Sequence, residues 1–256
     1  MARRLVLHIG LMKSGTTFVQ HVLAANSALL RERDVLFVHD SFPAQVRAVK
    51  DLIDGSAPPA PAGSPGGPWR ALVAEVAAWP GTAVVSMEFL GPRPAVKVRQ
   101  LVESLPEGIE LRVVLTVRDL ARTIPAMWQE SIQNRGVLEW SEYLEGVRVA
   151  DVTNPGPGRA FWTRQSASRI IEAWSSVVPI DAITVVTVPP SGAPAGELWR
   201  RFASVVPVDP EGFDLDVPSN PSLGLPSLMV LRQLNRRLAA GDELDPRSYE
   251  RIVKKL

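Results

Sequence analysis

The sequence predicts an α/β fold in which a mostly parallel central sheet is flanked by helices on both faces. Short apolar runs rich in valine, leucine and isoleucine alternate along the chain with longer segments whose apolar residues recur at helical spacing. Near-continuous apolar runs are typical of strands that are buried on both faces of a parallel sheet. The expected strands are residues 5–9, 35–38, 83–86, 111–117 and 183–188.

The length of 256 residues, with 46% hydrophobic and 21% charged residues, suits one globular domain over residues 1–256. A tract rich in proline, glycine and serine, residues 55–68, predicts a surface loop within that domain. A second loop is expected around Pro157, and Pro125 is expected to kink or restart its helix. The expected helices are residues 17–30, 46–53, 69–79, 93–105, 118–133, 163–177, 198–202, 225–238 and 248–256.

Charge and residue usage exclude several classes of site and partner. Lysine and arginine total 28 against 27 aspartate and glutamate, so no overall field attracts nucleic acid or a membrane surface. The chain has no cysteine, which excludes disulfides and thiolate metal sites. No apolar stretch approaches the length of about 18 residues that a membrane-spanning helix needs. We therefore expect a soluble, cytoplasmic protein with no nucleic-acid or membrane partner, in which any anion site is local.

The strongest local signal is the sequence GLMKSGTT at residues 10–17, between an expected strand and an amphipathic helix. Backbone N–H groups and the helix dipole favour an anion at such a helix N-terminus. Thr16 and Thr17 add hydroxyl donors, and Lys13 supplies a positive charge. The pattern predicts a phosphate-binding loop. The alternative is a capped turn that contains a lysine by chance.

This loop differs from the one used by nucleotide triphosphatases, which reads GxxxxGK followed by serine or threonine. Gly10 and Gly15 have the required separation, but Thr16 stands where that lysine belongs. The lysine lies before the second glycine instead, inside the loop. A P-loop nucleotide kinase is therefore an alternative whose main marker is missing.

Residues 13–17 resemble the loop P-K-S-G-T-T-W of sulfotransferases that use 3′-phosphoadenosine 5′-phosphosulfate (PAPS), a family with a P-loop, nucleotide-kinase-like fold. The resemblance implies that Lys13 contacts the phosphosulfate group. It also implies that the residues after it hold the 5′-phosphate: Ser14, Gly15, Thr16 and Thr17. Met12 replaces the proline of the motif, and Phe18 replaces the tryptophan. Phe18 is accordingly either an adenine-stacking residue or a core phenylalanine at the start of a helix.

A second anion site is implied at the end of the expected strand 111–117. Sulfotransferases bind the 3′-phosphate through an arginine that ends such a strand, and Arg118 occupies this position. The alternative is a surface salt bridge between Arg118 and Asp119 or another acidic residue. The family's serine eight residues later is replaced by Ala126, while residues 118–130 also resemble a segment of sulfotransferase-like proteins of actinobacteria. Hydroxyl or amide groups that are candidates to replace the serine belong to Thr123, Gln129 and Ser131.

Transfer to an alcohol also requires a group that accepts the hydroxyl proton. Some sulfotransferases use a histidine and others a glutamate just after the strand that precedes the 3′-phosphate arginine. In this sequence Glu88 falls at that position, and its alternative role is that of an acidic loop or cap residue. His39 is the next candidate base. The three histidines show no metal-ligand spacing, so no metal is expected.

The resemblance thus predicts transfer of the sulfuryl group from PAPS to a hydroxyl or amine of a small-molecule or carbohydrate acceptor. Lys13 and Glu88 are the predicted catalytic residues, and Lys13 to Phe18 together with Arg118 are the predicted donor-binding residues. A catalytically inactive protein that binds PAPS or another nucleotide is a further alternative. It is favoured by Ala126 and by the absence of the family's C-terminal R-K-G-x-x-G stretch.

Three basic residues of the helix 225–238 are expected to form a solvated face: Arg232, Arg236 and Arg237.

Overall fold

The computed structural model describes residues 4–54, 66–218, 223–241, 245 and 248–249. The chain divides into two compact units. The first comprises Met1–Arg118 and Arg164–Ser219, and the second comprises Asp119–Thr163 and Asn220–Leu256. One domain over residues 1–256 stays a prediction. Among the helices of the described residues, none is both long enough and apolar enough to cross a membrane.

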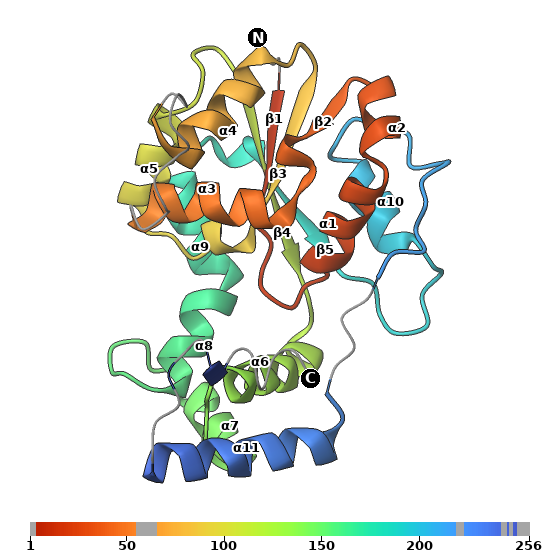
Figure 1. Cartoon of the computed structure of the whole chain (residues 1–256). Helices are drawn as coiled ribbons and strands as arrows, with labels where there is room; N and C mark the ends of the chain where they lie inside the picture. The colour runs from red at the N-terminus through yellow and green to blue at the C-terminus, as the bar shows by residue number, and fades with distance from the viewer. Residues whose placement is uncertain (1–3, 55–65, 219–222, 242–244, 246–247, 250–256) are drawn as a thin grey trace. The chain divides into compact units, whose positions relative to one another are not determined.

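The first unit is built around a sheet of five parallel strands in the order β2-β3-β1-β4-β5 (Figure 1). The strands are β1 (Arg4–His8), β2 (Val35–Phe37), β3 (Thr82–Ser86), β4 (Glu110–Val117) and β5 (Ile183–Thr187). β1 is the central strand, and its last residue, His8, is paired with Ser86 on one side and Val114 on the other. The predicted α/β class and the parallel sheet are confirmed.

Helices cover both faces of this sheet, as predicted. Side chains alternate along β1, so Leu5 and Leu7 point into one apolar cluster while Val6 points into the other. The first cluster is completed by α3 (Phe42–Asp54), α4 (Gly67–Ala78), α5 (Ala95–Glu103) and α9 (Ala167–Ser175). The second is completed by α1 (Thr16–Ala25), α2 (Ser27–Glu32) and α10 (Glu197–Ala203).

The edge strand β2 is shorter than its neighbour β3. Pairing between the two strands ends at Phe37 and Val84, although β3 continues to Ser86. Beyond this point the fully buried Gln45 of α3 bridges β3 and the segment that follows β2. Its Oε1 accepts the N–H of Ser86 at 2.9 Å, and its Nε2 donates to the Val38 carbonyl at 2.7 Å. A side-chain amide thereby takes the place of a peptide group where β2 has ended.

The second unit is helical. It contains α6 (Leu120–Gln133), α7 (Trp140–Val149), most of α8 (Pro157–Gln165) and α11 (Leu225–Ala240). α6 runs through Pro125, so the expected helix continues past the proline. Arg232 of α11 is buried, and it donates to the Val137 carbonyl at 2.9 Å and to the Glu139 carboxylate. The expected solvated face therefore holds for Arg236 and Arg237 and is wrong for Arg232.

Several predicted boundaries are also wrong. The expected helix 17–30 is interrupted at Asn26. The side-chain amide of Asn26 donates to the Val22 carbonyl, which is also the acceptor of a backbone hydrogen bond of the helix. The expected helix 163–177 is split where Ser166 caps α9, and Pro157 begins α8 instead of lying in a loop. α7 was not predicted, and the helix expected from residue 118 begins at Leu120.

The proline- and glycine-rich tract ends earlier than expected, because α4 already begins at Gly67. Pro68 lies in the first turn of α4. Backbone N–H groups in the first turn have no acceptor within the helix, so a proline there costs no hydrogen bond. Residues 55–65 of the expected loop lie outside the described residues. Most of the helix expected over residues 248–256 does as well.

We predict that Leu7→Ala lowers the free energy of unfolding by about 2–5 kcal/mol, because it leaves a cavity in the first apolar cluster. Leu7 is fully buried in the central strand. Urea unfolding measures the loss. The matched control is Val185→Ala on the edge strand β5, where the side chain is 45% exposed and the change is expected to stay within about 0.5 kcal/mol. Equal losses in the two variants would contradict the assignment of the core.

Candidate functional site

The predicted phosphate loop lies where β1 leaves the carboxyl edge of the sheet and enters α1. Gly15 is the N-cap of α1 and has a φ of 81°, a conformation that favours glycine. The first hydrogen bond of the helix runs from the Val19 N–H to the Gly15 carbonyl at 3.1 Å. The N–H groups ahead of Val19 therefore have no acceptor within the helix and can bind an anion.

Lys13 has a positive φ of 63°, which is uncommon for a residue with a side chain. Its side chain and that of Thr17 are half-buried, whereas Ser14 and Thr16 are buried. The Ser14 hydroxyl donates to the Leu11 carbonyl at 2.5 Å. This bond uses the only proton of the hydroxyl, so the predicted contact of Ser14 with the 5′-phosphate is left to its backbone N–H.

Gly10 is fixed at the start of the loop by close packing. A methyl group at this position would lie 2.5 Å from Thr16 Cγ2, 2.6 Å from Thr116 Oγ1 and 2.9 Å from His8 Nε2. The first of these contacts involves the loop's own helix, and the other two involve β4 and β1. Glycine is thus required for the loop to lie this close to the ends of both strands.

The structure brings Arg118 to the same loop. Arg118 follows β4 directly, and its Nη1 donates to the Lys13 carbonyl at a long 3.4 Å. The carboxylate of Asp119 accepts the N–H of Arg122 at 2.9 Å and contacts the Arg122 guanidinium at 2.5 Å. Arg118 therefore places a positive charge beside the loop that carries Lys13.

Thr123, Gln129 and Ser131, the candidates to replace the serine that binds the 3′-phosphate in sulfotransferases, belong to α6 in the second unit. The Ser131 hydroxyl donates to the Trp128 carbonyl at 2.7 Å, and the Gln129 amide donates to the Leu223 carbonyl at 3.5 Å. Thr123 is buried, and its hydroxyl makes no hydrogen bond within the described part of the chain. Their role toward a 3′-phosphate stays a prediction.

Glu88 begins the short 3-10 helix η2 (Glu88–Leu90), just after β3. Gln20 of α1 is buried, and its Nε2 donates to Glu88 Oε2 at 3.1 Å and to the Ser86 carbonyl at 3.0 Å. α1 thus both begins at the phosphate loop and orients the Glu88 carboxylate. The sequence analysis missed Gln20, although a polar residue among the apolar positions of an amphipathic helix was a usable signal.

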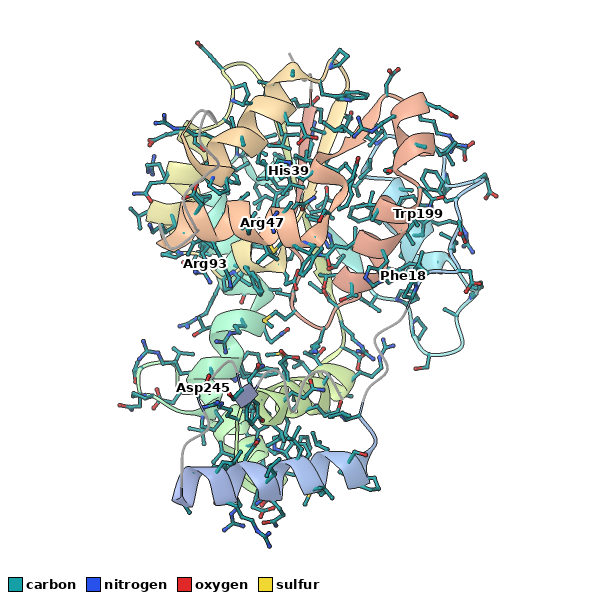
Figure 2. The ribbon with its side chains drawn as sticks, in the orientation of Figure 1. Phe18, His39, Arg47, Arg93, Trp199 and Asp245 are labelled. Carbon is teal, nitrogen blue, oxygen red and sulfur yellow. The ribbon has the colours of Figure 1, made fainter. Side chains whose placement is uncertain are left out.

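A second glutamine that the sequence analysis missed supports the loop from α8. Gln165 is buried, and its Nε2 donates to the Met12 carbonyl at 3.0 Å. Nothing in the sequence spacing connects residue 165 with the loop. Phe18 lies at the start of α1 (Figure 2), where it is half-buried and packs against the second apolar cluster. Its contacts agree with the core alternative, and stacking on adenine stays a prediction.

The three histidines have separate environments. His8 is fully buried at the end of β1, and burial lowers its pKa to about 3. A ring nitrogen of His21 lies 2.6 Å from the Pro218 carbonyl. His39, the alternative base, forms a 2.7 Å pair with Glu75 of α4. Within the described ranges, no three histidine, aspartate or glutamate side chains are grouped so that they can hold a metal ion.

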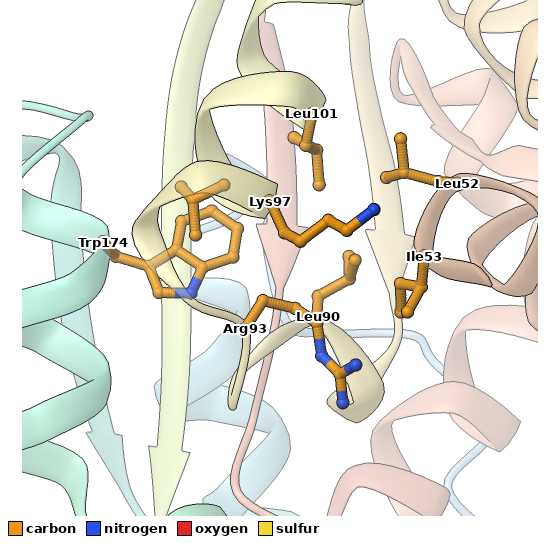
Figure 3. Close-up of a pocket in the computed structure, with 8 residues that line it drawn as sticks. Leu52, Ile53, Leu90, Arg93, Lys97, Leu101 and Trp174 are labelled. Carbon is orange, nitrogen blue, oxygen red and sulfur yellow. The ribbon is translucent and has the colours of Figure 1, made fainter.

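A small cavity adjoins the turn that carries Glu88 (Figure 3). Arg93 and Lys97 lie at this cavity, so it combines two cations with apolar walls. The cavity volume of about 10 Å³ is far below the roughly 300–1,000 Å³ of typical ligand pockets, so the cavity does not accommodate a nucleotide. The apolar walls are formed by Leu52, Ile53, Leu90, Val98, Leu101 and Trp174.

A larger depression lies at the opposite edge of the sheet, where the strands begin. Both of its arginines are bonded within the protein: Arg4 pairs with Glu110 at 2.9 Å, and Arg33 donates to the Asp209 and Glu211 carbonyls. It contains none of the predicted site residues. In a parallel α/β sheet ligands bind at the carboxyl edge, so the loop edge remains the candidate site in spite of the larger opening elsewhere.

Comparison with solved structures identifies a similar fold in a sulfotransferase from Alicyclobacillus acidocaldarius. The two structures align with a TM-score of 0.53 and 15% sequence identity, over 98% of this chain and 100% of the other. The chain has the fold of this sulfotransferase. No family model and no curated protein matches the sequence, so the resemblance to actinobacterial proteins stays a prediction.

We predict that Gly10→Ala destabilises the protein by about 1–3 kcal/mol and distorts the loop, because the added methyl group overlaps three neighbouring atoms. Thermal unfolding and the NMR shifts of the loop amides measure the two effects. Gly156→Ala is the control: a methyl group there meets no atom within 4 Å, and its stability is expected to be unchanged or slightly raised. A wild-type spectrum of Gly10→Ala would rule out the close packing.

Proposed function

We propose that this protein is a PAPS-dependent sulfotransferase that acts on a hydroxyl or amine of a small-molecule or carbohydrate acceptor. The proposal rests on the meeting of three predicted residues at one edge of the sheet. The loop that carries Lys13 contacts Arg118, and the helix that follows the loop contacts Glu88. The fold shared with a sulfotransferase supports the same activity.

In this proposal the loop holds the 5′-phosphosulfate end of the donor. The amides of Gly15, Thr16 and Thr17 and the dipole of α1 match the negative charge of such a group. Lys13 adds a compact positive charge that can stabilise the charge developing on the phosphate when the sulfuryl group departs. The donor itself supplies the activated sulfuryl group, so the protein's contribution is to position and to stabilise charge.

Glu88 is proposed to take the proton of the acceptor as the new bond from oxygen or nitrogen to sulfur forms. Gln20 donates to Oε2, which restrains the carboxylate, and Oε1 is proposed to accept the proton. Arg118 is proposed to bind the 3′-phosphate, where a guanidinium can form two parallel hydrogen bonds.

A nucleotide kinase is the weaker alternative, because Thr16 occupies the position of the lysine that a nucleotide triphosphatase loop requires. An inactive nucleotide-binding protein predicts the same donor binding without turnover. The two experiments below separate these functions from the proposed one.

The first experiment compares the binding of 3′-phosphoadenosine 5′-phosphate and adenosine 5′-phosphate by calorimetry. We expect tighter binding of the 3′-phosphorylated nucleotide and a loss of most of this difference in Arg118→Ala. The expected loss is about tenfold or more, the value of a charge-assisted hydrogen bond. Arg112→Ala, which removes an arginine from the same strand away from its carboxyl end, should keep the preference. Equal affinity of the wild-type protein for both nucleotides would count against the PAPS site.

The second experiment follows release of 3′-phosphoadenosine 5′-phosphate from PAPS in the presence of a panel of alcohols and amines. Glu88→Gln keeps the shape of the side chain but cannot take a proton, so turnover should fall by about 10²–10⁴ with donor binding unchanged. The control Glu103→Gln alters an exposed glutamate at the end of α5 and should retain full activity. Normal turnover in Glu88→Gln would make Glu88 structural. Donor binding without turnover in the wild-type protein would favour the inactive alternative.

A further inference from the structure

Four side chains beneath the phosphate loop form a continuous chain of hydrogen bonds across the three central strands. Ser86 Oγ of β3 lies 2.7 Å from His8 Nδ1 of β1, and His8 Nε2 lies 3.1 Å from Thr116 Oγ1 of β4. Thr116 Oγ1 lies 2.7 Å from Ser14 Oγ, which in turn donates to the Leu11 carbonyl at 2.5 Å. All four side chains are fully buried.

The final carbonyl determines the position of every proton in this chain. A carbonyl only accepts, so the single proton of Ser14 points to Leu11, and Ser14 must accept from Thr116. The one proton of Thr116 is then used, and Thr116 must accept from His8 Nε2–H. A neutral imidazole protonated at Nε2 has a bare Nδ1.

Ser86 therefore donates to Nδ1, and the hydrogen bonds run in one direction from β3 to the loop. The low pKa of His8 agrees with a neutral ring, and the ring is held from the side by an edge contact with Phe202 of α10, with centroids 5.0 Å apart.

We propose that His8 is a positioning residue that holds the phosphate loop in its anion-binding shape through Thr116 and Ser14. The part of the loop from Leu11 to Ser14 contains the positive φ of Lys13, a conformation that persists only where the surroundings fix it. The Ser14 hydroxyl closes this turn onto Leu11, and its position is set by Thr116 and hence by His8. The expected effect on nucleotide affinity rests on the proposed function, whereas the expected effect on the loop itself does not.

The test uses Thr116→Val, which keeps the shape of the side chain and removes the hydroxyl between His8 and Ser14. We expect faster hydrogen exchange of the amides of residues 14–17 and about tenfold weaker binding of 3′-phosphoadenosine 5′-phosphate. Thr116→Ser restores the hydroxyl and should recover both properties. In the wild-type protein, ¹⁵N NMR should show His8 protonated at Nε2 alone.

Ser104→Ala is the matched control, because the Ser104 hydroxyl accepts from Trp69 Nε1 and donates to the Leu101 carbonyl away from the loop. We expect it to lower thermal stability without changing loop exchange or nucleotide affinity. Wild-type loop exchange in Thr116→Val would overturn the proposal, and so would a His8 ring protonated at Nδ1. If the wild-type protein binds no nucleotide, the proposed function fails, and the exchange rates and the tautomer still decide the role of His8.

Discussion

The central position of β1 in an all-parallel sheet is the constraint on which the candidate site depends. Because β3 and β4 are both hydrogen-bonded to β1 in the same direction, all three strands end at one edge. The loop after β1, Glu88 after β3 and Arg118 after β4 are consequently brought together by the pairing of backbones that are far apart in the sequence. Glu88 and Arg118 lie within two residues of the ends of their strands, so the register of the strands largely determines where they lie.

Features that depend on nearest neighbours were predictable. The five predicted apolar runs correspond to the five strands of the sheet. A strand that is buried on both faces is apolar at nearly every position, so it is easy to recognise in the sequence. The phosphate loop was equally visible, because a glycine at positive φ, the start of a helix and the preceding strand are all local. The family resemblance predicted that Glu88 and Arg118 lie near this loop. The parallel pairing of β3 and β4 with β1 is the physical reason for their position.

Features that depend on tertiary pairing were not predictable from spacing. Gln20 and Gln165 are polar residues on helices whose partners, the Glu88 carboxylate and the Met12 carbonyl, are known only from the fold. Asn26 interrupts a helix through its own side chain, and it also donates to the Asp214 carbonyl at 2.9 Å, far along the chain. Arg232 was assigned to solvent because of its charge, but the carboxylate of Glu139 and the Val137 carbonyl make its burial possible.

The early end of β2 has a consequence for the neighbouring strand. The N–H and carbonyl of a strand residue point to the same side, and in Ser86 both point away from β1. Gln45 from one helical layer binds the N–H of Ser86, and Gln20 from the other layer binds its carbonyl. These two side chains make the hydrogen bonds that a neighbouring strand would otherwise make. If β2 were longer by one or two residues, it would displace both glutamines and Glu88 would lose its hydrogen-bond donor. The orientation of the proposed base is thus tied to the length of the edge strand β2.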